Sequence, residues 1–170
     1  LSEDYVDDSN ENLYKILNDN IGNNMLRTAS LSTPVSNTYV DLAFVIDTTG
    51  SMSPYIKNVK DNVTDFAKYL EDKGINLRVA IVEYRDTTSD GINSTIVHKW
   101  NGSTWHTKTT DMVTTLTKLS ANGGGDEPET AIDGLGYLVD DANTLLWSSK
   151  AFKFAVLLTD ASPKTNNRHG

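Results

Sequence analysis

The sequence contains no cysteine, which excludes disulfide bonds and zinc sites built from thiolates. It also lacks any apolar run that approaches eighteen residues, so we expect no membrane-spanning helix in this chain. Basic residues are outnumbered, with 15 Lys and Arg against 23 Asp and Glu, a formal charge of -8 and a pI of about 4.7. Because phosphates bind basic surfaces, this acidity argues against nucleic acid as a partner.

The length and the apolar content are those of one folded domain with an N-terminal extension. The chain has 170 residues, of which 38% are hydrophobic. Residues 1–38 are polar and rich in Asn and Asp. Within them Leu13, Ile16, Leu17 and Ile21 keep helical spacing, which predicts one amphipathic helix packed on the domain, or alternatively a linker from an upstream module. We assign residues 39–170 to the domain itself.

A buried strand that ends in oxygen-bearing side chains is the central pattern of the sequence. Residues 42–46 are all apolar, as in a strand buried on both faces, and Asp47, Thr49 and Ser51 follow at alternate positions. One carboxylate and two hydroxyls suit a hard cation such as Mg²⁺. The plainer alternative is a turn followed by a helix cap, where the same residue types are common.

The rest of the chain alternates helical and strand patterns. Apolar residues at steps of three and four predict a helix over 53–72, and a second buried strand follows over 77–84. This strand-helix-strand order predicts a parallel sheet. Residues 94–100 alternate as in an antiparallel edge strand, and Thr109 or Thr110 is predicted to cap the next helix.

A glycine run and a further buried strand complete the pattern. The run Gly123 to Gly125 is followed by Asp126 and Glu129, and it matches neither a dinucleotide-binding fingerprint nor a P-loop. A long helix is predicted next, from the spacing of Ile132, Leu135, Val139, Ala142 and Leu146. Residues 154–158 form the next predicted strand, and Asp160 follows it.

Three stretches, 42–52, 123–129 and 156–160, together resemble the von Willebrand factor type A (VWA) domain with its metal-ion-dependent adhesion site (MIDAS). The resemblance implies a doubly wound, mostly parallel Rossmann-like α/β sheet with one antiparallel edge strand and helices on both faces. Complete members continue with further helix-strand repeats, so we expect the C-terminal part of the usual fold to be missing here.

The resemblance also implies the metal site and its ligands. These are Asp47, Thr49, Ser51, Asp126 and Asp160, around Mg²⁺, or else Mn²⁺ or Ca²⁺. Asp126 departs from the commonest pattern, in which a threonine hydroxyl occupies this position. A carboxylate also binds hard cations, but Asp126 and Glu129 could instead only favour the N-terminus of the following helix through its dipole.

We predict a binding module rather than an enzyme. The metal would coordinate a Glu or Asp carboxylate of a protein partner, as in adhesion, and the remainder of its own polypeptide is a further candidate partner. The Asn- and Thr-rich, cysteine-free composition favours a bacterial secreted or cell-surface protein.

Two alternatives remain open at this point. The first is an intracellular VWA module within an ATPase or kinase assembly. The second is a Mg²⁺-dependent phosphoryl-transfer enzyme resembling the haloacid dehalogenases, which need a second aspartate where this chain has Thr49.

Overall fold

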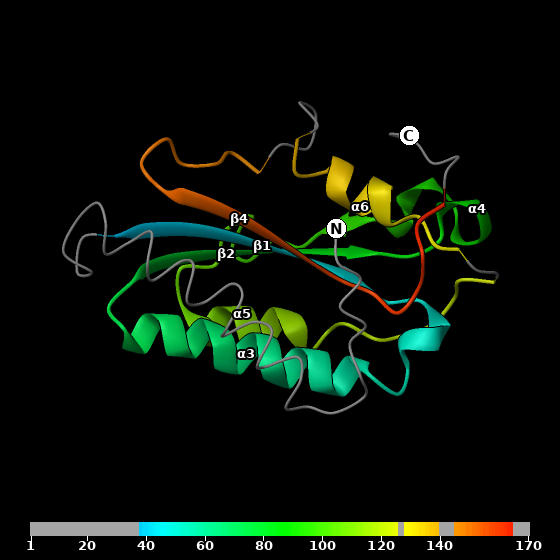
Figure 1. The fold of residues 1–170 in the computed structure, drawn as a ribbon, viewed down its shortest axis with the longest axis horizontal. Coiled ribbons are helices and arrows are strands. Elements are labelled where there is room, and N and C mark those ends of the chain that lie inside the picture. Colours follow the sequence, from blue (N-terminus) through cyan, green and yellow to red (C-terminus); the bar gives the residue numbers. More distant parts are fainter. Residues whose placement is uncertain (1–37, 126–127, 140–144, 165–170) are drawn as a thin grey trace.

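A computed structural model of the chain describes residues 38–125, 128–139 and 145–164 (Figure 1). The predicted amphipathic helix of the N-terminal segment lies outside the described residues, as do Asp126 and Ala142. In the described part of the chain, no helix combines the length and the apolar character that a membrane span requires.

The core of the fold is a four-stranded sheet in the order β3-β2-β1-β4. Strands β1 (Tyr39–Asp47), β2 (Asn76–Tyr84) and β4 (Phe152–Leu158) are parallel, while β3 (Ile96–Val97) pairs with β2 in the antiparallel direction. Strand β1 lies between β2 and β4 over nearly its whole length. The predicted doubly wound, mostly parallel sheet with an antiparallel edge is therefore confirmed.

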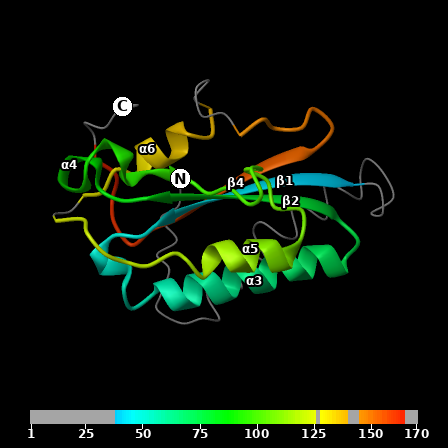
Figure 2. The same ribbon diagram turned by 180° about the vertical axis from the view of Figure 1, so that it is seen from behind.

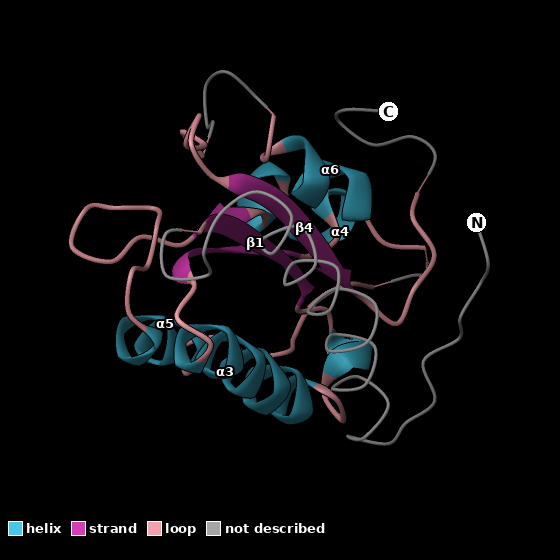
Figure 3. Cartoon of the chain, turned by 60° about the vertical axis from the view of Figure 1, so that its left-hand side comes forward, coloured by secondary structure: helices cyan, strands magenta, loops and turns pink. Residues whose placement is uncertain are grey.

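Helices cover both faces of this sheet (Figures 1 and 2). Helices α3 (Ile56–Asp72) and α5 (Thr109–Leu116) lie side by side on one face. The short helices α4 (Thr87–Asp90) and α6 (Ala131–Gly136) lie on the other, and Figure 3 shows the sheet between the two layers. This arrangement explains why the central strands have apolar residues at consecutive positions.

Strand β1 contributes side chains to two cores. Phe44 belongs to the core under α3, where it is fully buried together with Phe66, and Val45 belongs to the core under α6 with Leu138. Each large apolar side chain buried in this way contributes about 1.5–3 kcal/mol. The loop that follows β1 therefore starts from a firmly held strand end.

The helix predicted over 53–72 is confirmed, although its first turn differs. Residues Gly50–Met52 form a 3₁₀ turn, and α3 itself begins at Ile56. The prediction that Thr109 or Thr110 caps α5 is wrong, because Lys108 is the N-cap and Thr109 is already helical. The Thr109 hydroxyl donates instead to the Glu71 carboxylate at the end of α3.

The long helix predicted after the glycine run is wrong. Helix α6 ends at Gly136, and Leu146 has a positive φ of 37°. Three of the side chains on its predicted apolar face are exposed, at 36% for Ile132, 79% for Val139 and 78% for Leu146, whereas Leu135 packs partly buried against the core under α6.

Two glycines account for the short helix. Gly134 and Gly136 each disfavour a helix by about 1 kcal/mol relative to alanine. Gly134 is needed for packing, since a Cβ there would lie 2.8 Å from Val45 Cγ1 and 2.9 Å from Tyr84 Cδ1. Close approach to the sheet therefore outweighs helical periodicity in this segment.

The antiparallel edge strand is confirmed but shorter than the predicted 94–100. It covers only Ile96–Val97, because Ile92–Ser94 form a 3₁₀ turn before it. After it, Trp100 and Ser103 exchange backbone hydrogen bonds across a tight turn at Asn101 and Gly102, whose φ angles are 49° and 81°. The edge strand is therefore followed directly by an Asn-Gly turn.

Candidate metal centre

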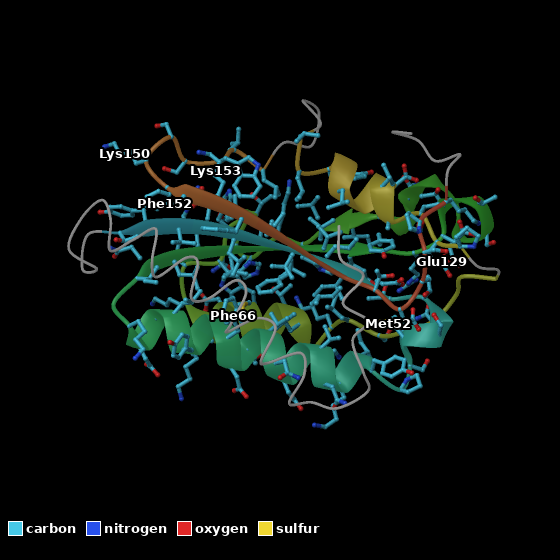
Figure 4. The ribbon with its side chains drawn as sticks, viewed as in Figure 1. Met52, Phe66, Glu129, Lys150, Phe152 and Lys153 are labelled. Carbon is cyan, nitrogen blue, oxygen red and sulfur yellow. The ribbon has the colours of Figure 1, made fainter. Side chains whose placement is uncertain are left out.

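Four of the five predicted ligands lie where the direction of the sheet order changes. The chain leaves β1 towards β2 on one side, while β4 pairs on the other side of β1. Ligand sites of open α/β sheets form at this place, beyond the carboxyl ends of the strands. Loop 48–51 follows β1 there, and Thr159 and Asp160 follow β4. Figure 4 places Glu129 and Met52 at this end, opposite Lys150 and Phe152.

Asp47 is fully buried and organises the polar groups around it. Its Oδ1 accepts hydrogen bonds from the Thr49 backbone N, at 2.9 Å, and from Thr49 Oγ1, at 2.7 Å. Its Oδ2 accepts from Tyr84 OH at 3.2 Å and from Thr159 Oγ1 at 2.7 Å. With four donors around it, the carboxylate fixes its neighbours, including Thr49 in the loop after β1 and Thr159 in the loop after β4.

Two hydroxyl oxygens face each other beside this carboxylate. Thr49 Oγ1 and Ser51 Oγ are 3.1 Å apart. The two oxygens are within hydrogen-bonding distance of each other, but a carboxylate is the stronger acceptor for each hydrogen: Thr49 Oγ1 donates to Asp47 Oδ1, and Ser51 Oγ donates to Asp160 Oδ1 at 3.0 Å. The lone pairs of both oxygens therefore remain for another group.

The spacing of these oxygens matches a magnesium coordination shell. Octahedral Mg²⁺ has bonds of about 2.0–2.1 Å, which places neighbouring ligand oxygens about 3 Å apart. The 3.1 Å between Thr49 Oγ1 and Ser51 Oγ fits two adjacent positions of such a shell. The fold thus brings together four of the five predicted ligands, Asp47, Thr49, Ser51 and Asp160, which we call the hydroxyl-carboxylate cluster.

The glycine run forms the wall next to this cluster. Gly123 O accepts from Gly50 N at 3.0 Å, and Asn122 N donates to Thr48 O at 2.9 Å. Gly124 has a φ of 92°, and a Cβ on it would lie 3.2 Å from Thr49 Cβ. Any other residue would be strained here, both by the backbone angle and by this contact. Gly123 and Gly124 therefore lie against the loop that follows β1.

A family model for the von Willebrand factor A domain matches residues 41–170. The chain belongs to the von Willebrand factor A domain family. The match includes all five predicted ligand positions. It also includes every strand of the described sheet, except for the first two residues of β1.

Two curated proteins are similar to part of this chain. The putative ariadne-like RING finger protein R811 of Acanthamoeba polyphaga mimivirus is 29% identical over 115 residues, covering 66% of this chain and 11% of that protein. The alpha-protein kinase vwkA of Dictyostelium discoideum is 26% identical over 122 residues, covering 72% of this chain and 18% of that protein. The chain thus spans less than a fifth of either relative.

Tyr84 and Glu129 lie next to the candidate metal centre, although the sequence analysis did not include them among its ligands. Burial, followed by the nearby Asp47 carboxylate, raises the pKa of Tyr84 well above its ordinary value, so its hydroxyl stays a donor. The Glu129 carboxylate adds to this effect and is 3% exposed. The motif 123–129 contained Glu129, but its placement beside Tyr84 depends on the pairing of residue 129 with Ser162 and Lys164.

The loop after β2 forms a third side of the candidate metal centre. Asp86 is buried, accepts from Thr88 N and Ser89 N at the start of α4, and pairs with Lys164 at 2.8 Å. Burial by itself would raise the pKa of Asp86, but Lys164 and the Ser89 and Thr88 donors outweigh it and lower the pKa to about 2. The run Asp86-Thr87-Thr88-Ser89 is a helix-cap pattern that sequence reasoning could have recognised.

The cluster depends on hydroxyls rather than on acidic side chains alone. Among residues 38–125, 128–139 and 145–164, no three His, Cys, Asp or Glu side chains are grouped so that they could hold a metal ion. A MIDAS-type arrangement would need the Thr49 and Ser51 oxygens in addition. Membership of the family supports a protein-interaction module in general terms.

Proposed function

We propose that this VWA domain binds a divalent cation, Mg²⁺ or Mn²⁺, and through it a carboxylate of a partner protein. The carrying observation is the pair of hydroxyl oxygens of Thr49 and Ser51, 3.1 Å apart with their hydrogens donated to Asp47 and Asp160. A hard cation is the group that accepts two such lone pairs at once. A turn or a helix cap alone would not require this arrangement, and the Thr49 side chain forms no cap hydrogen bond to the 3₁₀ turn that follows it.

The residues of the cluster then have distinct roles. Thr49 and Ser51 would contact the ion directly, and Asp160 would hold the Ser51 hydroxyl and face the ion from β4. Asp47 already accepts four hydrogen bonds, which suits a carboxylate that acts through Thr49 and through water. Asp126 is proposed as the ligand from the glycine loop.

The cation would reverse the local charge. The chain carries a formal charge of -8, so an acidic partner would be repelled by the protein alone. A bound divalent ion is the largest local charge in such a site and attracts the partner's carboxylate to its open coordination position. Partner binding should therefore depend on metal.

The geometry favours binding over phosphoryl transfer. A nucleophilic aspartate needs an oxygen that is accessible to the phosphorus atom, whereas Asp47 is fully buried with both oxygens occupied by donors. Position 49, where a phosphatase would carry its acid-base aspartate, is a threonine that donates to Asp47. We therefore propose no catalytic role for this domain.

The names of the relatives favour one of the two expected settings. One is a kinase and the other a putative RING finger protein, and this domain corresponds to a small part of each. We propose an interaction module within a multidomain assembly of that kind. A bacterial secreted or cell-surface location stays a prediction from composition, and fractionation of source cells with an antibody against residues 39–170 tests it.

Calorimetric titration tests the metal. Protein stripped with EDTA is titrated with Mg²⁺ and Mn²⁺, and the same is done for Ser51→Ala and for Ser53→Ala, an exposed serine two positions further along the loop. We expect saturable binding that Ser51→Ala weakens by at least about tenfold and Ser53→Ala leaves unchanged. Absence of binding by the wild-type domain would refute the proposal.

The partner's carboxylate is tested at saturating metal. A Glu-containing peptide or acetate should bind with Mg²⁺ and not with EDTA. Asp126→Thr should weaken metal binding and strengthen carboxylate binding, because a hydroxyl leaves more of the cation's charge unneutralised. If both affinities stay the same, residue 126 does not contact the ion and the helix-dipole interpretation of Asp126 is preferred.

A further inference from the structure

The glycine run is held from outside the cluster by one exposed carboxylate. Asp90, at the end of α4, accepts a hydrogen bond from the Gly124 backbone N at 2.8 Å. A Cβ on Gly123 would collide with the same carboxyl group. The backbone of the run is therefore shaped around the Asp90 side chain on one side and around Thr49 on the other.

Asp90 is itself held in place by a network that reaches α6. Its backbone N donates to Asp86 O at 2.7 Å, and the Asp86 side chain caps α4. At the start of α4, Thr87 N donates to Thr130 Oγ1 at 3.1 Å, and Thr87 Oγ1 donates to the fully buried Asp133 at 2.9 Å. The exposed Asp90 carboxylate thus belongs to a segment that is hydrogen-bonded to buried residues.

Three successive glycines would otherwise leave the loop free. Gly123, Gly124 and Gly125 have φ angles of 72°, 92° and 115°, in a region where glycine has many accessible conformations and loses much entropy on being fixed. A hydrogen bond from Gly124 to a charged acceptor is among the stronger contacts that can select one conformation. Because Gly124 touches Thr49 and Gly123 bonds to Gly50, the selected conformation is transmitted to the cluster.

We infer that Asp90 is a positioning residue for the metal centre, which it serves by fixing Gly124 against Thr49 without contacting the ion. This inference rests on the proposed metal binding. A fixed loop holds the Thr49 hydroxyl in one arrangement, so the cation does not have to order it when it binds. The competing explanation is that the Asp90 charge simply attracts the cation over a distance.

Asparagine separates the two explanations. Asp90→Asn keeps an oxygen that accepts from Gly124 N but removes the charge, whereas Asp90→Ala removes both. Asp65→Ala, on the exposed surface of α3, is the matched control for loss of one negative charge. Two readouts are needed: Mn²⁺ affinity by calorimetry, and hydrogen exchange of the Gly124 amide by NMR in the metal-free protein.

Positioning predicts that Asp90→Ala accelerates Gly124 exchange and weakens Mn²⁺ binding by about tenfold, because the cation must then order the loop itself, at a cost limited by the one hydrogen bond to a charged group that was lost. Asp90→Asn should restore most of both, and Asp65→Ala should change neither. The inference is overturned if Asn behaves like Ala, which would identify a charge effect, or if faster exchange leaves affinity unchanged.

The failure of this inference is distinguishable from that of the proposed function. Wild-type protein that binds no Mn²⁺ overturns both. Wild-type binding that Asp90→Ala leaves intact overturns only the role of Asp90.

Discussion

Replacing Thr49 with valine tests the centre most directly, because the two side chains have nearly the same shape. Thr49 is buried, and its hydroxyl donates to Asp47 Oδ1 at 2.7 Å. In the variant Asp47 still accepts from Thr49 N, Tyr84 OH and Thr159 Oγ1. Without metal the substitution therefore removes one hydrogen bond to a charged group, and we expect the free energy of unfolding to fall by about 1.5–3 kcal/mol.

Metal should enlarge this difference. A ligand at a hundred times its dissociation constant stabilises the native protein by about 2.7 kcal/mol. Valine offers no lone pair, so the variant should gain almost none of this stabilisation. The stability difference between wild type and Thr49→Val should therefore rise to about 4–6 kcal/mol in saturating Mg²⁺, as the sum of the two effects.

Urea denaturation followed by tryptophan fluorescence, in EDTA and in Mg²⁺, measures both values. Thr49→Ser keeps the hydroxyl and is the control, so its stability should rise with Mg²⁺ as that of the wild type does. A difference between wild type and Thr49→Val that is the same in EDTA and in Mg²⁺ would show that Thr49 only supports Asp47, and the metal argument would fail.

Three further predictions concern the surroundings of the cluster. Asp47→Ala should abolish Mg²⁺ binding in calorimetry and lower stability by about 2 kcal/mol or more, because four donors lose their acceptor; unchanged affinity in a folded variant would contradict this. Gly124→Ala should cost about 1–3 kcal/mol in urea denaturation, since its φ is 92° and the new Cβ would lie 3.2 Å from Thr49 Cβ. The folded pKa of Asp86, about 2, lies below its ordinary 3.8, so its contribution of about 2 kcal/mol is present above pH 4 and is lost as pH falls towards 2. Lys164→Met should flatten that part of the stability profile, and an unaltered profile would show that the pair does not lower the pKa.

The parts of the fold predicted correctly are those in which one local pattern dominates. Continuous apolar residues over 42–46 identified the central strand, and the three-four spacing identified α3. The long helix predicted from Ile132 onward is wrong. Its apolar residues keep helical spacing, but the segment does not pack on the sheet as one helix. Gly134 lies too close to Val45 for any side chain, so contact with the sheet decides that segment.

For the candidate site, the sequence by itself determined the chemistry: a carboxylate and two hydroxyls at alternate positions directly after a buried strand, followed later by a glycine run and another aspartate. Only the tertiary structure decided how those groups are used. Thr159 and Asp47 are 112 positions apart, and Gly124 and Asp90 are 34 apart, yet each pair is joined by a hydrogen bond. Such bonds require donor and acceptor to lie within about 3 Å, a distance that residue spacing along the chain does not fix. The packing of β4 against β1, and of α4 against α6, fixes it instead.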